Sequence, residues 1–266
     1  MFEHVAALFF DLDGTLVDSV PDLTAAVNAM LQQLGLPERP EARVRTWVGN
    51  GMNNLIHRAL TDDMAGQADP ELFARARPLY KAAYAEHISV YSSLYPGAVE
   101  GLTELRGAGF PMACVTNKSV EFALPLLDRL GIGHFFATVI GGECAPNPKT
   151  APDALLLCAE RLGIPIRRGL MIGDSRNDVG AARNAGCPVV CVPYGYNHGY
   201  DIRDAQPDAV IASIADLPAL LSQRVLTSGV ISRQDYTVGL AGTRRRCVPT
   251  GNLPGKTFYG NRPESR

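Results

Sequence analysis

Residues 7–19 read ALFFDLDGTLVDS, where four apolar residues lead directly into two aspartates separated by one leucine. Along an extended strand, residues i and i+2 point to the same side. Asp11 and Asp13 are therefore expected close together at the carboxyl end of a buried strand, where their negative charges repel each other. A bound metal ion, a proton held by one carboxyl group or exposure to solvent could each offset this repulsion.

The second half of the chain alternates short apolar runs with segments of helical periodicity. The runs FPMACVTN, FATVIGG, GLMIGD, PVVCVPYG and DAVIAS are predicted strands, and amphipathic helices are predicted between them. Near-continuous apolar strands that alternate with helices are typical of a parallel sheet covered on both faces. We therefore predict an α/β fold with a doubly wound, Rossmann-like parallel sheet.

No strand is predicted between residues 20 and 94, where the periodicity is helical throughout. The last helix of this segment, PELFARARPLYKAAYAEHI, is expected to be interrupted by Pro78. We predict a parallel-sheet core formed by residues 1–19 and 95–222, with an all-helical cap, residues 20–94, inserted after the first strand. The connections near residues 19–20 and 95–97 are predicted hinges.

Composition limits the class of protein and its partners. The chain is 46% hydrophobic and 20% charged, which fits a globular protein, and its net charge of −2 gives no reason to expect nucleic acid. The apolar runs are too short to span a membrane and no basic leader precedes them, so we expect a cytoplasmic monomer or small homo-oligomer. Residues 223–266 are predicted to be a poorly ordered tail, basic because residues 225–266 hold seven Lys or Arg against two acids.

Polar side chains recur at the ends of the predicted strands, where open α/β sheets bind their ligands. They are Asp11, Asp13, Thr116, Asn117, Lys149, Asp174 and Asp178. Several carboxylates together suit a hard cation such as Mg²⁺. A lysine and a hydroxyl can hold phosphoryl oxygens, one carboxylate can attack phosphorus, and a second can protonate the leaving oxygen.

The motifs DLDGTLVDS, VTNK, Lys149 and GDSRND occur in this order and resemble the four motifs of the haloacid dehalogenase superfamily of phosphohydrolases. Within the superfamily, WVGNGMNNLIHRAL and SVPDL resemble the bacterial phosphoglycolate phosphatases, and the similarity covers about residues 5–222. The resemblance implies Mg²⁺-dependent hydrolysis of a phosphomonoester through an aspartyl-phosphate. The implied substrate is a small phosphorylated organic acid, 2-phosphoglycolate.

The resemblance also implies roles for the carboxylates. Asp11 corresponds to the nucleophile, which is also a Mg²⁺ ligand, and Asp13 to the general acid and base, whose backbone carbonyl binds the metal. Asp174 completes the protein's metal ligands, and Asp178 supports the site from behind. Without the resemblance, Asp174 and Asp178 could equally be helix-capping or solvated residues.

Phosphate binding is assigned by the resemblance to Thr116, Asn117 and Lys149. The family often has Lys-Pro-x-Pro at the lysine, whereas this chain has Lys-Thr-Ala-Pro over residues 149–152. The lysine is kept, so we expect the chemistry to be the same and the local turn to differ.

Substrate choice is assigned to the stretch RVRTWVGNGMNNL, residues 43–55. Glycines allow a tight loop here, Asn50 offers hydrogen bonds, and Arg45 can pair with a carboxylate. We hypothesise that the loop reaches the active site when the cap closes. The alternative is that Trp47, Leu55 and Ile56 form the core of the cap and the glycines make a turn between helices.

Other functions fit the sequence less well. A calcium loop would need glycine and glutamate where the chain has Leu16 and Asp22. A dinucleotide-binding dehydrogenase would need G-x-G-x-x-G after the first strand. A phospho-receiver domain is shorter and has no such insertion, and a dehalogenase has no need for Asp13. A phosphomutase would share nearly all of these residues and stays open, as does a phosphatase of another sugar or organic-acid phosphate.

Overall fold

The computed structural model describes residues 2–222, so the predicted basic tail, residues 223–266, lies outside the described part of the chain. The central sheet is parallel throughout, with strand order β5-β4-β1-β6-β7-β8. Its strands are β1 (Ala7–Phe10), β4 (Met112–Val115), β5 (Thr138–Ile140), β6 (Gly169–Gly173), β7 (Val189–Cys191) and β8 (Ala209–Val210). The predicted doubly wound parallel sheet is confirmed.

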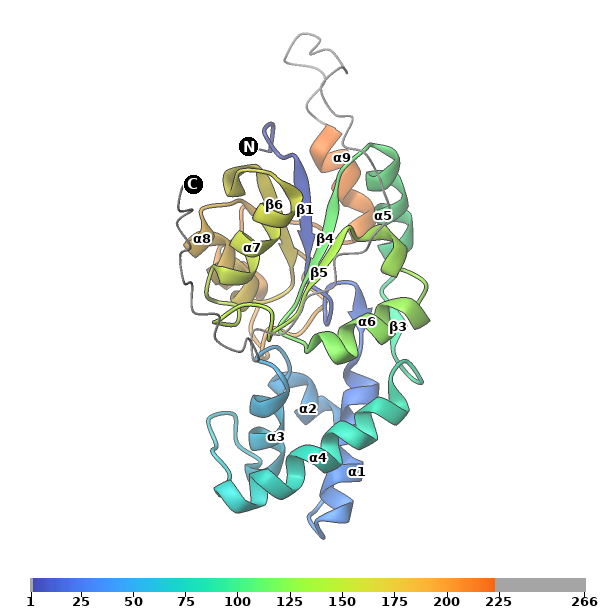
Figure 1. Ribbon diagram of the computed structural model, residues 1–266, viewed down its shortest axis with the longest axis vertical. Helices are drawn as coiled ribbons and strands as arrows, with labels where there is room; N and C mark the ends of the chain where they lie inside the picture. Colours follow the sequence, from blue (N-terminus) through green and yellow to red (C-terminus); the bar gives the residue numbers. More distant parts are fainter. Residues whose placement is uncertain (1, 223–266) are drawn as a thin grey trace, which may run out of the picture.

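Helices cover both faces of the sheet (Figure 1). Leu8 and Phe10 of β1 belong to one apolar cluster with α5 (Ala98–Gly107), α6 (Val120–Arg129) and α9 (Leu217–Ser222). Ala7 and Phe9 belong to a second cluster with α7 (Asp153–Leu162) and α8 (Arg176–Ala185). Successive side chains of a strand point to opposite faces, so a continuously apolar strand is buried by helices on both sides.

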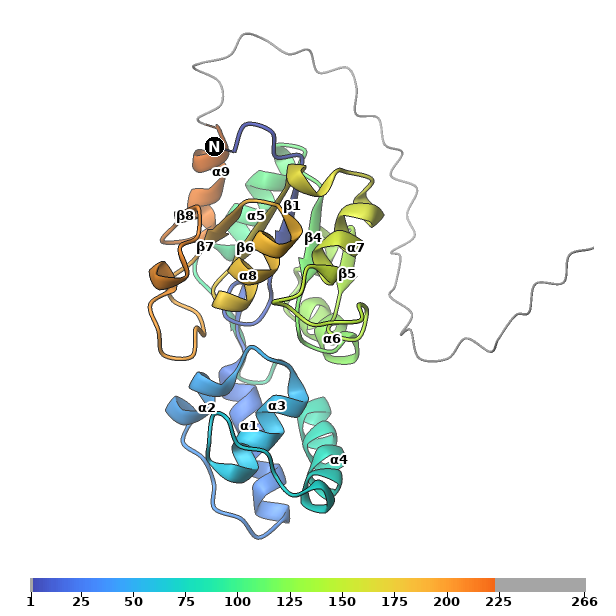
Figure 2. The ribbon, with the colours of Figure 1, turned by 90° about the vertical axis from the view of Figure 1, so that its left-hand side faces the viewer.

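Four further helices lie beyond the carboxyl ends of the strands, at the bottom of Figures 1 and 2. They are α1 (Val20–Gln33), α2 (Glu41–Trp47), α3 (Met52–Thr61) and α4 (Pro70–His87). The two connections to the sheet pair with each other as short antiparallel strands, β2 (Val17–Asp18) and β3 (Ser93–Leu94). The arrangement is consistent with the predicted insertion, and the exact division into core and cap stays a prediction.

Two local expectations differ from the structure. β3 falls within residues 20–94, where we expected no strand, because two residues are too few to give a periodic signal. α4 continues through Pro78 instead of being interrupted. Proline removes one helical hydrogen bond. Here Tyr80 and Tyr84 bury the same helix in the apolar cluster that includes α1, which outweighs that loss.

The position of β1 fixes where a ligand can bind. Phe10 is in register with Cys114 of β4 on one side and Ile172 of β6 on the other. The three strands therefore end at the same level, and the strand order reverses its direction at β1. In open α/β sheets this reversal opens a crevice at the carboxyl ends.

The remaining elements are short. The 3₁₀-helices are η1 (Gly133–Phe135), η2 (Ile166–Arg168), η3 (Ile202–Ala205) and η4 (Ile214–Asp216). Within residues 2–222, none of the helices combines the length and the apolar character needed to cross a bilayer.

Candidate active site

Lys149 occupies the centre of the crevice and joins two of the predicted carboxylates. Its Nζ lies 2.8 Å from Asp11 Oδ1 and 2.7 Å from Asp178 Oδ1, and it donates to the Val115 carbonyl at 2.9 Å. The Lys149 side chain is only 2% exposed. Burial alone would lower its pKa, but the Asp11 and Asp178 carboxylates raise the pKa above its usual value. Lys149 is therefore a permanent buried cation.

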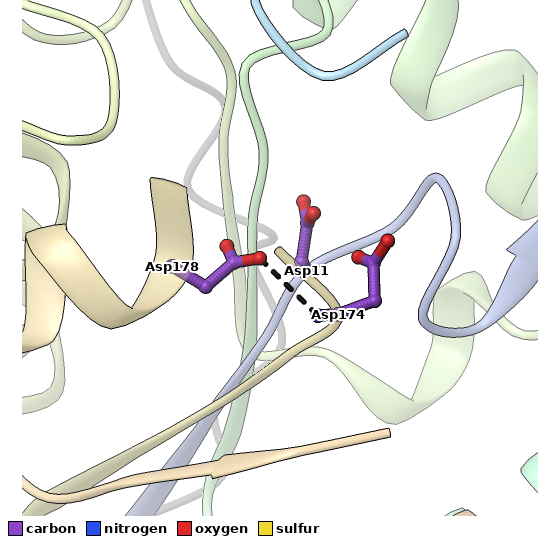
Figure 3. A group of neighbouring side chains, drawn as sticks. All are labelled: Asp11, Asp174 and Asp178. Atoms are coloured by element: carbon purple, nitrogen blue, oxygen red, sulfur yellow. Dashed lines mark hydrogen bonds between the residues drawn. The ribbon is translucent and has the colours of Figure 1, made fainter. Parts of the chain in front are cut away.

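Asp11, Asp174 and Asp178 bring carboxylate oxygens within 4.8 Å of one another (Figure 3). Burial raises the pKa of Asp11 to about 7, with a further increase from Asp178 that Lys149 opposes. Burial, then Asp178 and Asp11, raise the pKa of Asp174 well above its usual range. Buried like charges of this kind are relieved by protons or by a cation, and carboxylate oxygens are the ligands Mg²⁺ prefers. The donor set fits that ion.

Asp178 is already fully engaged by protein groups. Its Oδ2 accepts from the backbone N–H groups of Asp174 and Ser175 and from the Ser175 hydroxyl, while Oδ1 accepts from Lys149. These bonds form a capping box at the start of α8, the local reason for the sequence GDSRND. Asp178 thus fixes the positions of Asp174 and Lys149.

Asp174 lies beside the end of β1, where Gly14 makes room for it. The Thr15 hydroxyl donates to Asp174 Oδ1 at 2.9 Å, and the Tyr196 backbone N–H donates to Oδ2 at 2.5 Å. Gly14 has φ +90°, and a Cβ there would come within 2.3 Å of Asp174 Oδ2. A glycine is required both for the backbone conformation and for the close approach.

Asp13 lies apart from the acidic cluster and pairs with Lys118, a residue that the sequence reasoning missed. Lys118 Nζ is 3.0 and 3.1 Å from the two Asp13 oxygens and lies 4.8 Å above the Tyr84 ring. The Ser19 hydroxyl also donates to Asp13, at 2.5 Å. The sequence did contain a signal for Lys118, because it is the last residue of VTNK and directly follows Thr116 and Asn117 at the end of the strand.

Thr116 and Asn117 follow β4 as predicted, with different surroundings. The Thr116 Oγ1 accepts from the Lys118 backbone N–H at 3.1 Å, next to Asp11 in the cavity wall. The Asn117 amide donates to the Gly49 carbonyl at 2.9 Å and the Lys149 carbonyl at 3.0 Å, and it accepts from the Lys149 N–H at 2.8 Å. The Asn117 side chain thus joins the lysine segment to the helical layer, and its predicted phosphate contact remains untested.

A cavity of about 50 Å³ separates the strand ends from the four helices. Its walls are formed by Asp11, Asp13, Leu23, Val48, Gly49, Gly51, Met52, Leu55, Tyr80, Tyr84, Thr116, Asn117, Lys118, Ser119 and Phe122. Within the described chain, Lys118 is the one cation among these walls. The side facing the helices is mostly apolar.

The structure does not bring Arg45 and Asn50 into the cavity wall. Arg45 pairs with Asp18 at 3.2 Å and with Glu41 at 2.8 Å. Asn50 belongs to the loop of residues 48–51, and its Oδ1 accepts a hydrogen bond from Arg58 at 2.9 Å. That loop does line the cavity, through its neighbours Val48, Gly49 and Gly51. Trp47, Leu55 and Ile56 are buried, as the alternative interpretation of this stretch expected, although Leu55 also lines the cavity.

Comparison with known proteins places this arrangement in a family. The sequence profile of the haloacid dehalogenase-like hydrolases matches residues 5–186. A phosphoglycolate phosphatase of Nitrosococcus oceani is 49% identical over 223 residues, covering 84% of this chain and 99% of the relative. One from Escherichia coli K12 is 43% identical and covers 82% and 94%, respectively.

A solved structure gives the same answer. The crystal structure of a predicted phosphoglycolate phosphatase from Haemophilus somnus 129PT superimposes with a TM-score of 0.77 at 34% identity. The match covers 82% of this chain and 98% of that one. The resemblance noted in the motifs is confirmed: the chain is an enzyme and belongs to the haloacid dehalogenase-like hydrolase family.

Proposed function

We propose that this enzyme hydrolyses a small phosphomonoester, 2-phosphoglycolate, through a phosphorylated Asp11. The observation that carries the proposal is the cavity in which Asp11, Asp13 and Thr116 meet, with Lys149 2.8 Å from Asp11. Lys149 and the Thr116 hydroxyl are placed to hold phosphoryl oxygens beside the attacking carboxylate. The names of the relatives support the choice of substrate.

The chemistry divides between two carboxylates. An Asp11 oxygen attacks phosphorus while the bond to the leaving alkoxide breaks, and Asp13 gives that alkoxide its proton, releasing glycolate. Asp13 then takes a proton from a water molecule that attacks phosphorus, which breaks the bond to Asp11 and releases inorganic phosphate. Lys118, 3.0 Å from Asp13, orients the carboxyl group for both transfers.

Mg²⁺ would be held by Asp11, Asp174 and the backbone carbonyl of Asp13. The bound ion neutralises negative charge on the phosphoryl oxygens. Asp178 is proposed to act from behind by holding Asp174 and Lys149, since its own oxygens already accept hydrogen bonds from both.

The cavity supports a small, anionic leaving group. The cavity measures about 50 Å³, which favours a small ester over one that carries a nucleoside. Lys118 offers a cation to the carboxylate of such a group, and the apolar walls strengthen that attraction by excluding water.

We expect Asp13→Asn to slow hydrolysis of phosphoglycolate by about 10²- to 10⁴-fold, because both proton transfers are lost. Nitrophenolate leaves without a proton, so p-nitrophenyl phosphate should still release its first equivalent quickly and then stall. Stopped-flow absorbance would show a burst of one nitrophenolate per active site. A variant with unchanged steady-state rates on both substrates would remove Asp13 from the mechanism.

We expect Asn50→Ala to reduce kcat/KM for phosphoglycolate about tenfold and for p-nitrophenyl phosphate less than twofold. The reason is that Asn50 bonds the cavity-lining loop to Arg58. Glycolate is a poorer leaving group than nitrophenolate, so only phosphoglycolate depends on being positioned by this loop. Asn53→Ala is the matched control, since Asn53 is exposed on the same turn and contacts Arg77. Equal losses on both substrates would contradict a role in specificity.

Arg45→Ala, assayed in parallel, tests the predicted contact between Arg45 and the substrate carboxylate. To make that contact, Arg45 has to exchange Asp18 and Glu41 for the substrate. A loss confined to phosphoglycolate supports the exchange, whereas equal losses on the two esters mean that Arg45 acts through its present ion pairs.

A further inference from the structure

The aromatic loop, residues 194–197 (Tyr-Gly-Tyr-Asn), follows β7 and extends toward α2 (Figure 2). Tyr196 within it is 2% exposed. Its backbone N–H donates to Asp174 Oδ2 at 2.5 Å. Its hydroxyl accepts from the backbone N–H groups of Ser19 at 2.9 Å and Val20 at 3.3 Å. One residue therefore contacts both the acidic cluster and the point where the chain enters α1.

The Tyr196 hydroxyl takes the place of a missing helix cap. The first N–H groups of a helix have no partners within it, and a side chain at the N-cap usually accepts from one of them. Ser19 holds the N-cap position of α1 but makes no such bond, because its hydroxyl donates to Asp13. The start of α1 is thus anchored to a residue of the sheet domain, which also donates to Asp18.

A second helix of the same layer reaches the aromatic loop. The Arg45 guanidinium of α2 lies 5.2 Å from the centre of the Tyr196 ring and pairs with Asp18 at 3.2 Å. A cation that lies over an aromatic ring is attracted to the face of the ring, and the attraction is stronger where water is excluded. Displacement of α1 or α2 away from the sheet would therefore break contacts of Tyr196.

The second connection between the sheet and the helices, which ends near Tyr95, is linked to the same Asp174 carboxylate. The Tyr194 ring packs against Tyr95, with centroids 4.3 Å apart, and its hydroxyl donates to the Thr15 carbonyl at 3.0 Å. The Thr15 hydroxyl donates to Asp174 Oδ1 at 2.9 Å. Asp174 Oδ2 is therefore held by Tyr196, which contacts the first connecting segment, and Oδ1 is held by Thr15, which Tyr194 links to Tyr95 beside the second.

The packing around Asp174 leaves no room for the aromatic loop to shift independently. A Cβ on Gly195 would lie 2.2 Å from Asp174 Oδ2 and one on Gly14 would lie 2.3 Å from it. Because interiors packed this closely move together and are not compressed, a displacement of the loop moves the carboxylate.

We propose that Tyr196 is a positioning residue that couples closure of the helices α1–α4 over the crevice to the placement of Asp174. The inference rests on the proposed function only in taking Asp174 as a Mg²⁺ ligand. Groups that orient a metal ligand affect how tightly the site binds the metal. Coupling between two equilibria is reciprocal, so each changes the other by the same factor. Mg²⁺ binding must therefore shift the equilibrium toward the closed arrangement by the same factor by which closure increases the affinity for Mg²⁺.

The test compares wild type with Tyr196→Phe, which removes only the hydroxyl and keeps the bond from the backbone to Asp174. We expect the Kd for Mg²⁺, measured by calorimetry without substrate, to rise about three- to tenfold. The kcat/KM at limiting Mg²⁺ should fall by the same factor for phosphoglycolate and p-nitrophenyl phosphate. Tyr200→Phe is the matched control, because Tyr200 is 60% exposed just beyond the loop, and it should stay within twofold of wild type.

Hydrogen exchange reports the coupling directly at the amides of Ser19 and Val20. In wild type, Mg²⁺ should slow exchange in the peptide that contains them, and in Tyr196→Phe exchange should be faster and insensitive to Mg²⁺. A Tyr196→Phe protein that melts at a lower temperature but binds Mg²⁺ like wild type, or a wild-type peptide that ignores Mg²⁺ while the protein binds it, overturns the coupling. A wild-type protein that does not bind Mg²⁺ overturns the proposed function as well.

Discussion

Asp11→Asn is expected to lose turnover by about 10⁴-fold or more on every phosphate ester while remaining folded. An amide oxygen is a far poorer nucleophile than a carboxylate oxygen. Residual hydrolysis measured with a chromogenic ester, with circular dichroism to verify the fold, tests this. Asp204→Asn, which removes an exposed carboxylate far from the cavity wall, is the control and should be fully active. Retention of more than a few per cent of the activity would exclude Asp11 as the nucleophile.

The same variant should be more stable than wild type when Mg²⁺ is absent. Burial raises the pKa of Asp11 to about 7 in the folded protein, above its value of 3.8 in the unfolded chain. The folded state therefore holds the proton more tightly, and stability is lost as pH rises through about 7. In urea with a chelator, Asp11→Asn should gain about 1–3 kcal/mol over wild type at pH 8 and much less at pH 5. An equal difference at the two pH values would contradict this.

Lys149→Met is expected to have the largest effect on stability. Methionine fills similar space but leaves Asp11 and Asp178 without the cation that lies 2.8 and 2.7 Å from them. Removing one partner of a buried ion pair costs about 3–5 kcal/mol, because the remaining charge is left unpaired. The loss should be larger at pH 8 than at pH 5, where Asp11 takes up a proton. Activity should disappear as well, because Lys149 is the cation that we propose binds the phosphate.

The matched control for Lys149→Met is Lys81→Met. Lys81 pairs with Glu121 at 2.8 Å, but both side chains are substantially exposed, at 33% and 46%. Exposed pairs contribute about 0–1 kcal/mol, so this variant should be nearly as stable as wild type. A Lys149→Met protein no less stable than the control would mean that the pairing of Lys149 with the two carboxylates does not stabilise the fold.

The sequence predicted which polar side chains come together at the strand ends. Parallel strands in register end at one level, so Asp11, Thr116 and Asp174 could be expected together once the strands were recognised. The lysine and Asp178 followed from their positions at the starts of helices α7 and α8. For Asp11, Thr116 and Asp174 no knowledge of the packing was needed, because the register of the sheet alone determines where they lie.

Contacts between the two layers could not be predicted in this way. Lys118, which pairs with Asp13, lies over the Tyr84 ring of α4, and the Asn117 amide reaches the Gly49 carbonyl across the cavity. Arg45 was expected to be available for a substrate, but its partner Asp18 lies in a strand too short to recognise. Such pairings depend on how the helices pack against the strand ends. No hydrogen-bond register fixes that packing, and the periodicity of the sequence does not encode it.

We propose that Asp11 is phosphorylated during turnover, and the Asp13→Asn variant should make the phosphorylated enzyme accumulate. With p-nitrophenyl phosphate and Mg²⁺, phosphorylation needs no proton from residue 13, whereas hydrolysis of the aspartyl-phosphate does. Acid quenching at the end of the nitrophenolate burst, followed by peptide mass spectrometry, should find one phosphate per chain, on Asp11. A phosphate on Asp174 or another residue, or a full burst without any phosphorylated peptide, would contradict the account.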